Sequence, residues 1–464
     1  MTLLIEMPRS HAAERTYVLE VLLGEFLGLD WTYVPSDRPN VRITRCGEDR
    51  AVVLPDNLFS LSDAEWLSPT SLPQGPLAHW NSATLRTDIE LTAPDVPILF
   101  GERTGVTERD KNIVLPFDIF GSAFFMLTRY EEVAAPVFDV HERFPATSSL
   151  AYKAGFLYRP IVDEYVEILW AALRRIWPGL QRKTWQGRTR VTCDVDTPFD
   201  RCTHSIPMLG LKIAGDLVKR QDLRSAAQRV MRYRAHRRGD YSIDPNYTFD
   251  WYTDICERAG IAAAFYFIPD RSNPRMDCVY EIFDPEIIML IERLHAAGHE
   301  IGTHGSYNTF RDPAQISKER ARLISAASKT GRTIEVKGNR QHYLRWDSRE
   351  TADHLDASGY EYDTTGGFAD APGFRYGTGK SFRMWSWRQR AALSIRQRPL
   401  IVMESSIIDA GYLGLGYSSE GYELMRRLKS HTLRFGGDFT LLWHNSYFFR
   451  DDDKHWFSSL LVER

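Results

Sequence analysis

The chain has 464 residues, a formal net charge of −3 and a sequence pI near 6.5. Its length exceeds that of one ordinary domain, and a composition of 43% hydrophobic and 26% charged residues is typical of globular proteins. The weakly acidic balance excludes the generally basic surface of a nucleic-acid-binding protein, so we expect no nucleic-acid partner.

The absence of targeting features and the cysteine usage favour a cytoplasmic protein. The N-terminus, MTLLIEMPRSHAAER, has a short apolar run without the long apolar region or the small-residue cleavage site of a secretory signal. No segment approaches the roughly 20 uninterrupted apolar residues of a transmembrane helix. The five cysteines lack a paired CxxC motif and predict neither a disulfide framework nor a thiolate zinc site.

The first third of the chain predicts a smaller α/β domain, residues 1–185, whose role the sequence does not indicate. Apolar residues recur at helical spacing over 17–29, and further helices are expected over 118–132 and 161–177. Short apolar runs predict strands at 2–7, 41–46, 51–57 and 96–102.

A polar connector precedes a second domain, residues 186–464, in which helical patterns repeatedly lead into strand patterns. Such units force parallel strand pairing with crossover helices, which predicts an α/β sheet or barrel. The units lie at residues 249–270, 286–304, 315–340 and 350–365. A long, locally basic insert at about residues 201–240 interrupts this rhythm and predicts a helical hairpin. Its arginines are either plain solvated surface or a patch for an anionic head group or phosphate, which would allow peripheral membrane contact.

Polar residues with catalytic potential follow several predicted strands. Parallel barrels carry their chemistry at the carboxyl ends of the strands. These residues are Asp194 and Asp196 after the first strand, His304 and Asn308 after another, Arg340 after a third and His444 after the last. Each residue alone is weak evidence for an active site, since a single histidine is more often structural and a single arginine is more often an ion-pairing residue. Their combination predicts an active site.

These residues resemble the motifs of the polysaccharide deacetylases, the NodB-homology carbohydrate esterases, from about Val191 to the C-terminus. The segment TCDVD is similar to the family motif Thr-Phe-Asp-Asp, and HGSYN is similar to His-Ser/Thr-x-x-His. The segment RQHY matches an arginine followed by an aromatic residue, and LWH matches Leu-x-His. The N-terminal third looks like the extra region of a bacterial subgroup.

The resemblance implies a distorted (β/α) barrel, a divalent metal, most often zinc in this family, and defined residue roles. Asp194 would be the catalytic base, Arg340 the residue that orients it, and His444 the acid. Asp196, His304 and Asn308 would hold the metal. Such a metal polarises an acyl group and activates water.

Two departures from the family pattern leave alternatives open. Val195 separates the two aspartates, so the roles of Asp194 and Asp196 could be exchanged, although residues two apart on a strand point the same way. Asn308 replaces an imidazole, which favours harder, oxygen-preferring metals. Asp200 receives no role beyond capping the next segment.

Three further residues are expected to contact substrate: Tyr343, Trp443 and Arg375. The last lies in 367–378, whose glycines and proline predict a loop over the site. A structural ion pair is an equally weighted alternative for Arg375.

The expected function is removal of an acetyl group from an N-acetylated sugar, in a precursor or lipid-linked intermediate of a surface polysaccharide. An amidase acting on a small non-sugar substrate is the nearest alternative, because one fold can host both. A sugar-binding pseudoenzyme is the alternative of a different class, favoured by Asn308 and Val195.

Overall fold

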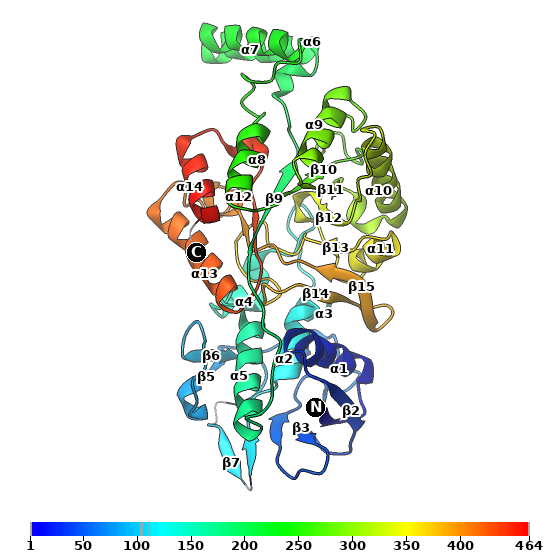
Figure 1. Ribbon diagram of the computed structural model, residues 1–464, viewed down its shortest axis with the longest axis vertical. Helices are drawn as coiled ribbons and strands as arrows, with labels where there is room; N and C mark the ends of the chain where they lie inside the picture. Colours follow the sequence, from blue (N-terminus) through cyan, green and yellow to red (C-terminus); the bar gives the residue numbers. More distant parts are fainter. Residues whose placement is uncertain (1, 103–104, 110, 463–464) are drawn as a thin grey trace.

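The structure is a computed structural model that describes residues 2–102, 105–109 and 111–462. Figure 1 shows the N-terminal region (blue and cyan) at one end of an elongated molecule. The larger C-terminal region lies in the middle, and helices α6 and α7 lie at the other end.

The N-terminal region is built around a six-stranded mixed sheet with the order β2-β1-β3-β4-β8-β7. Its strands are β1 (Leu3–Met7), β2 (Trp31–Pro35), β3 (Asn40–Arg45), β4 (Val52–Pro55), β7 (Thr107–Arg109) and β8 (Asn112–Val114). Strands β5 (Ala78–Asn81) and β6 (Asp95–Ile98) form a separate antiparallel pair, so the expected strand at 96–102 lies outside the main sheet.

The helices of this region are α1 (Ala12–Leu19), α2 (Ile119–Leu127), α3 (Tyr130–Ala134), α4 (Leu150–Lys153) and α5 (Ile161–Ile176). Helix α1 continues as a π-helical segment, η1 (Glu20–Phe26). Every residue of α2 is buried, as expected of a helix that is apolar on all sides. The single helix expected over 118–132 is broken at Arg129, which adopts a left-handed conformation with φ 53° and forms buried ion pairs with Glu131 and Glu132.

The C-terminal region contains a nine-stranded sheet with the order β14-β15-β13-β12-β11-β10-β9-β17-β16. Its strands are β9 (Thr189–Val195), β10 (Ala264–Phe267), β11 (Glu300–Gly305), β12 (Gly338–Gln341), β13 (Tyr362–Asp363), β14 (Phe382–Ser386), β15 (Ala391–Gln397), β16 (Val402–Met403) and β17 (Phe439–Leu442). All neighbours pair in parallel except β14 with β15. The predicted α/β class is therefore confirmed.

The expected barrel is not confirmed by strand pairing. Within the described residues no ladder joins β14 to β16, the two edges of the sheet. Strand β15 nevertheless ends at Gln397 beside β13, and β16 begins at Val402 beside β17. Because only residues 398–401 separate them, the sheet must curve until its two sides come close.

The helices that flank this sheet are α8 (Phe249–Arg258), α9 (Pro285–Ala296), α10 (Pro313–Ser328), α11 (Thr351–Ala357), α12 (Glu404–Ile408), α13 (Ser419–Arg434) and α14 (Asp451–Val462). The predicted insert forms a hairpin of α6 (Ile206–Gly215) and α7 (Leu223–His236), joined through a π-helical segment, η6 (Asp216–Arg220). In residues 2–102, 105–109 and 111–462, we find no helix with the length and apolar character needed to cross a bilayer.

Two hydrophobic cores follow the two sheets, and the segment after β13 joins them. Residues Phe368, Ala371 and Tyr376 belong to the C-terminal part of the chain but pack in the N-terminal core. The buried ammonium group of Lys380 also bonds Asp163 of α5 at 2.7 Å. The two regions therefore share an extensive interface.

Candidate metal centre and active site

The strand β9 directs two carboxylates into one cavity. Val191, Cys193 and Val195 point into the hydrophobic core, so the alternating residues point to the other face of the sheet. Asp194 is buried, whereas the Asp196 side chain is 29% exposed toward the cavity. The strand spacing thus places both carboxylates in one site, as predicted.

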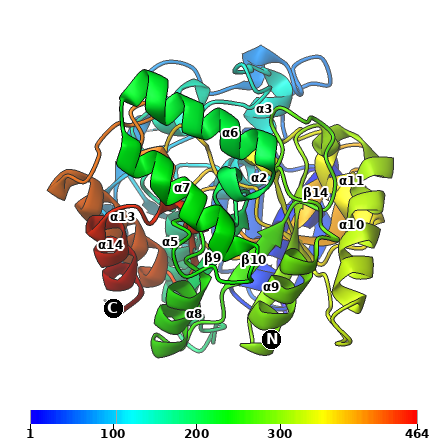
Figure 2. The same ribbon diagram turned by 90° about the horizontal axis from the view of Figure 1, so that it is seen from above.

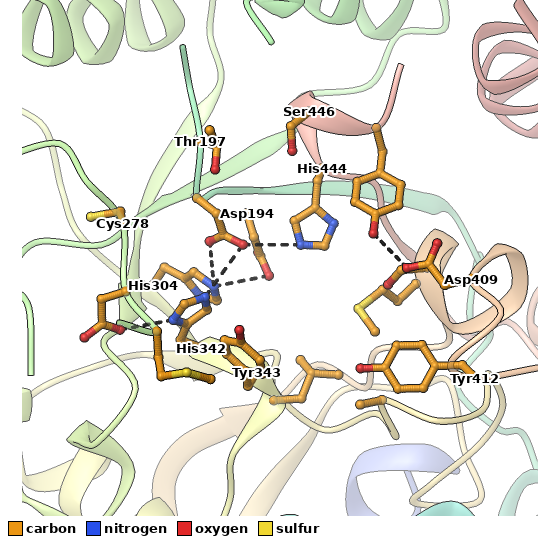
Figure 3. A pocket seen from close by; sticks show the side chains of 18 of the residues that line it. Asp194, Thr197, Cys278, His304, His342, Tyr343, Asp409, Tyr412, His444 and Ser446 are labelled. Carbon is orange, nitrogen blue, oxygen red and sulfur yellow. Dashed lines mark hydrogen bonds and ion pairs between the residues drawn. The ribbon is translucent and has the colours of Figure 1, made fainter. Parts of the chain in front are cut away.

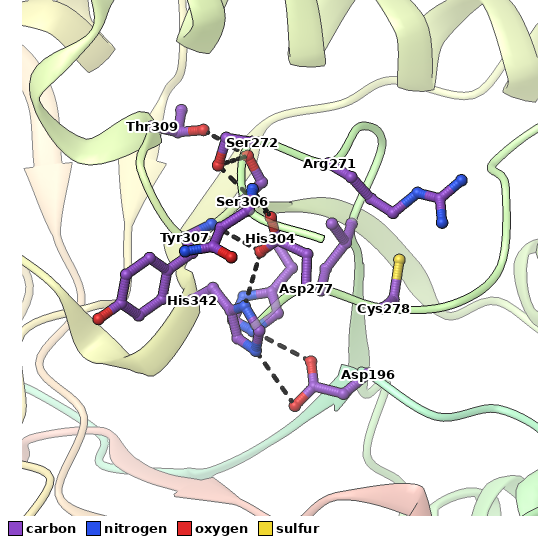
Figure 4. A network of polar contacts seen from close by, with 12 residues as sticks. Asp196, Arg271, Ser272, Asp277, Cys278, His304, Ser306, Tyr307, Thr309 and His342 are labelled. Atoms are coloured by element: carbon purple, nitrogen blue, oxygen red, sulfur yellow. Dashed lines mark hydrogen bonds and ion pairs between the residues drawn. The ribbon is translucent and has the colours of Figure 1, made fainter. Parts of the chain in front are cut away.

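Two histidines from neighbouring strands converge on Asp196. The Nε2 atom of His304, on β11, lies 3.3 Å from Asp196 Oδ1, and the Nε2 atom of His342, just after β12, lies 3.7 Å from Asp196 Oδ2. One ligand atom from each of these three residues lies within 4.8 Å of the others (Figure 4). This is the spacing of a group that can hold one metal ion.

The other nitrogen of each imidazole has a partner that fixes the ring. His304 Nδ1 lies 2.9 Å from the Arg340 carbonyl oxygen, and His342 Nδ1 lies 3.1 Å from Asp277 Oδ1. Asp277 is itself held by the Tyr307 amide, which donates to the same oxygen at 2.7 Å. Outer hydrogen bonds of this kind are typical of metal-binding histidines, because they leave Nε2 free to face the ion.

The donor set fits a divalent metal. Asp196 Oδ1 is a buried atom without a hydrogen-bond partner in the described structure, and such an atom is costly unless an ion or water satisfies it. Burial raises the pKa of Asp196, but the His342 and His304 imidazoles outweigh burial and hold that pKa well below its usual range. Burial lowers the pKa of His342, yet the Asp196 and Asp277 carboxylates raise it to about 9. The negative potential of these carboxylates, which favours a proton on His342, would equally favour a metal cation at this site.

The structure does not bring Asn308 into this group, contrary to its expected role as a ligand. Asn308 is exposed, its amide nitrogen donates to the Ser272 carbonyl at 3.2 Å, and its oxygen accepts from Arg345 at 3.2 Å. The residue does not line the cavity. His342 takes the third position instead.

The sequence carries a signal for His342 that the motif comparison overlooked. Arg340 and His342 are two residues apart at the end of β12, so both side chains point the same way, as do Asp194 and Asp196. The family motif in RQHY involves only the arginine and the tyrosine, so the resemblance assigns no role to the histidine between them.

Arg340 lies against Asp194, in the place predicted for the residue that orients the base. Its Nη1 donates to Asp194 Oδ1 at 3.0 Å and to the Thr192 hydroxyl at 2.9 Å. The rest of the guanidinium bonds Thr364, and the side chain is fully buried. A buried, multiply bonded arginine fixes one face of the carboxylate and leaves Oδ2 free toward His304, at 3.6 Å.

His444, two residues after β17, lies beside the two aspartates (Figure 3). Its Nδ1 atom lies 2.5 Å from Glu404 Oε1, and its Nε2 atom lies 3.7 Å from Asp196 Oδ2. Burial lowers the pKa of His444, but the Glu404 carboxylate outweighs burial and raises it to about 10. Glu404 is a site residue without a predicted role. It directly follows an apolar run, Leu400 to Met403, so the strand-end rule applies to it as well.

The cavity has a volume of about 330 Å³ and a second wall across from the metal group. This volume suits a small ligand. Arg143, Asp409, Tyr412 and Tyr447 line that wall, as Figure 3 shows for Asp409 and Tyr412. The Tyr447 hydroxyl donates to Asp409 at 2.8 Å. Because Arg143 belongs to the N-terminal region, both parts of the chain contribute to the cavity.

Tyr343 lines the cavity in a strained conformation. It and Leu344 have φ values of 61° and 56°, which non-glycine residues rarely adopt. Arg143 Nη1 donates to the Tyr343 carbonyl at 3.1 Å, and the His141 and Tyr343 rings lie 4.8 Å apart. The N-terminal region therefore supports this turn, and strain retained beside a cavity is typical of functional sites.

The other two expected substrate contacts lie elsewhere. Trp443 is fully buried, stacks on Phe448 and does not line the cavity. Arg375 is also buried and forms two hydrogen bonds with Glu132, at 2.9 Å and 2.8 Å. The loop at 367–378 lies between the two regions because its apolar side chains pack in the N-terminal core, and only Ala369 reaches the cavity. The structural ion pair is thus the correct alternative for Arg375.

Comparisons with known proteins give a partial family match and distant structural likenesses. Residues 3–178 match a family described as Family of unknown function (DUF7033), which covers less than half of the chain. No curated protein matches.

Three solved structures illustrate the likenesses. A "putative polysaccharide deacetylase" from Mycobacterium smegmatis has 16% identity and a TM-score of 0.39 over 61% of this chain and 84% of its own. A family 4 carbohydrate esterase from Streptomyces lividans in complex with acetate has 11% identity and a TM-score of 0.28 over 60% of this chain and 88% of its own. PuuE allantoinase has 11% identity and a TM-score of 0.36 over 61% of this chain and 85% of its own. Scores this low do not establish function, so the functional conclusion depends on the site.

Proposed function

We propose that the chain is a metal-dependent hydrolase that removes an acetyl group from an N-acetylated sugar. The observation that carries this proposal is the arrangement around one cavity: a three-residue metal group, the Asp194–Arg340 pair and the His444–Glu404 pair. Amide hydrolysis needs one group that accepts a proton from water and another that donates a proton to the leaving nitrogen. The two pairs would meet this need, because Asp194 and His444 line the same cavity as Asp196.

Asp196, His304 and His342 would hold the ion. Two imidazoles and one carboxylate form a donor set that catalytic zinc sites use, which favours zinc over the harder metals suggested by Asn308. When bound, the ion would supply a Lewis acid for the acyl oxygen and lower the pKa of a water molecule.

Asp194 would act as the base. Its Oδ1 atom is held by Arg340, so Oδ2 remains directed toward the metal group, where it can accept a proton from the attacking water. Asp196 is the ligand, because it lies closer to both metal-binding imidazoles. We therefore favour Asp194 as the base and Asp196 as the ligand over the exchanged roles.

His444 would act as the acid. Glu404 fixes its Nδ1 atom, so Nε2 faces the cavity and can donate a proton to the amine as the C–N bond breaks. Tyr343 and the wall of Arg143, Asp409 and Tyr412 would bind the sugar through hydroxyl, guanidinium and carboxylate groups. A carbohydrate that is lipid-linked would suit the same cavity if its acetylated residue enters first.

The pseudoenzyme alternative loses its main support. It is favoured by two departures, Asn308 and Val195. His342 supplies an imidazole in place of Asn308, and Asp194 and Asp196, on either side of Val195, both line the cavity. The non-sugar amidase keeps the same chemistry and differs only in substrate.

A substrate panel tests the proposal. Metal-stripped protein, reloaded with zinc, is incubated with an N-acetylhexosamine, a short N-acetylhexosamine oligomer, an O-acetylated sugar and a small cyclic amide, and acetate or ring opening is measured. We expect zinc-dependent acetate release from an N-acetylated sugar, and release that is about 10²-fold to 10⁴-fold slower from the Asp194→Asn variant. Hydrolysis of the cyclic amide alone would favour the amidase, and zinc-loaded protein that binds sugar without releasing acetate would favour the pseudoenzyme.

A further inference from the structure

The α6–α7 hairpin, residues 206–238, stands apart from the body of the protein. Figure 1 shows it at the end of the molecule, connected to the strand β9 and to α8 by two narrow segments. Figure 2, the view from above, shows both helices lying side by side across that end. The outward surfaces of the two helices together form one exposed face at that end of the molecule.

This face is apolar where a surface helix is normally polar. Helix α6 has no buried residue at all, although its sequence IPMLGLKIAG is mostly apolar. Six large apolar side chains of the hairpin are between 40% and 77% exposed: Ile206, Leu211, Leu217, Val218, Leu223 and Met231. On α7, Leu223, Ala227 and Met231 are exposed at intervals of four residues, so they form one stripe.

Unpaired basic side chains surround the apolar stripe. Residues 206–238 contain nine lysines and arginines against two aspartates, in a chain whose formal net charge is −3. Six of the nine form no ion pair within the described part of the chain: Lys212, Lys219, Arg224, Arg234, Arg237 and Arg238. Basic residues beside exposed aliphatic residues are typical of helices that lie in the surface layer of a bilayer.

The root of the hairpin is held firmly. Asp200, which precedes the hairpin, pairs with Arg229 at 3.5 Å and with Arg232 at 3.2 Å. Within the hairpin, Asp216 of η6 pairs with Arg229 of α7 and with Arg220. Asp200 therefore does more than cap the next segment, because it fastens α7 to the end of β9. The outer face is thus presented by a fixed element rather than by a loose loop.

We propose that the α6–α7 hairpin docks on the surface of an anionic lipid bilayer. The exposed aliphatic stripe would enter the headgroup layer while the basic side chains meet lipid phosphates. A second copy of the chain fits this face poorly, since a symmetric contact would bring two strongly basic surfaces together. Nucleic acid would pair with the charge but would leave Leu211, Val218 and Leu223 exposed.

Docking would bring the cavity close to the membrane. Thr197 and Arg201 line the cavity and belong to the short segment between β9 and α6. The docking surface and the rim of the site therefore share one piece of chain. The docking inference does not depend on the reaction that the cavity catalyses.

Vesicle co-sedimentation tests the inference with the full-length protein. Vesicles of pure phosphatidylcholine are compared with vesicles that contain phosphatidylglycerol, at 0.1 M and 1 M salt. We expect binding only to the anionic vesicles and strong weakening at high salt, because the Debye length falls from about 10 Å to about 3 Å.

Paired variants assign the binding to the hairpin. The double substitution Lys219→Glu and Arg224→Glu should weaken vesicle binding about 25-fold or more, since each basic side chain near an anionic surface contributes a factor of about 5. The double substitution Val218→Ser and Leu223→Ser should weaken it about 10-fold. The matched controls Arg174→Glu, on α5, and Met289→Ser, on α9, are exposed but distant and should bind like the wild type. Unchanged melting temperatures would show that all variants fold.

Three outcomes would overturn the inference. The first is equal recovery with neutral and anionic vesicles. The second is binding that the hairpin variants do not weaken. The third is a failure to bind either kind of vesicle. In that case, binding of duplex DNA by the basic residues would indicate nucleic acid as the partner. Conversion of a dimer to a monomer by the Val218 and Leu223 substitutions, measured by gel filtration, would indicate a second copy of the chain.

Discussion

The two walls of the cavity differ in where their side chains come from. One wall is formed at the ends of β9, β11, β12 and β17, whose parallel register places Asp194, Asp196, His304, Arg340 and His444 at one edge of the sheet. The other wall comes from irregular segments that are far apart in the sequence, at Arg143, Asp409, Tyr412 and Tyr447. Rigid strand ends suit groups that must be held precisely enough for proton transfer, whereas loops suit substrate selection. We infer that chemistry resides in the first wall and selectivity in the second.

The largest effects should follow from removing a proton-transfer group of the strand-end wall. Asp194→Asn and His444→Ala should each lower kcat by about 10² to 10⁴, the usual contribution of a positioned acid or base. Neither residue belongs to the metal group, so metal content should remain at the wild-type level. Steady-state kinetics together with elemental analysis checks both statements. Near-wild-type turnover in either variant would remove that residue from the mechanism.

An intermediate effect is expected from the groups that orient the metal-binding imidazoles. Asp277→Asn keeps the size of the side chain but removes the charge that holds His342 Nδ1 at 3.1 Å. Metal affinity should fall about 10-fold to 100-fold, as it does for other outer partners of metal-binding histidines. Competition with a chelator of known affinity measures this change. If the affinity does not change, His342 does not depend on Asp277 for its orientation.

The smallest effect should come from the loop wall. Arg143→Ala should raise KM about tenfold, the cost of one charge-assisted hydrogen bond to substrate, with little change in kcat or metal content. Arg143→Lys keeps the positive charge and should recover part of the affinity. A fall in kcat as large as that of the His444 variant would place Arg143 in the chemistry and erase the difference between the walls.

The same contrast explains what could be predicted from the sequence. Alternation along a strand and the strand-end rule locate Asp194, Asp196, His304, Arg340 and His444, because these depend only on local periodicity. The same rule also applies to His342 and Glu404, which follow the strands β12 and β16.

The remaining features depend on long-range packing and lie outside such local rules. No local pattern connects Arg143 with Tyr343, two hundred residues away along the chain. The glycines of 367–378 correctly indicate an irregular segment, but they do not reveal that Phe368 and Tyr376 pack in the N-terminal core. Arg375 therefore pairs with Glu132 instead of substrate. The helix and strand rhythm likewise does not reveal that, among the described residues, no ladder joins the two edges of the larger sheet.

The most direct test of the account compares the metal content of His342→Ala with that of Asn308→Ala. Both variants are purified with equimolar zinc, dialysed and analysed for bound metal, with circular dichroism to confirm that they fold. Because His342 lies in the metal group and Asn308 is exposed outside the cavity, His342→Ala should lose its zinc and Asn308→Ala should retain it. Retention by His342→Ala with loss from Asn308→Ala would contradict the proposed metal centre.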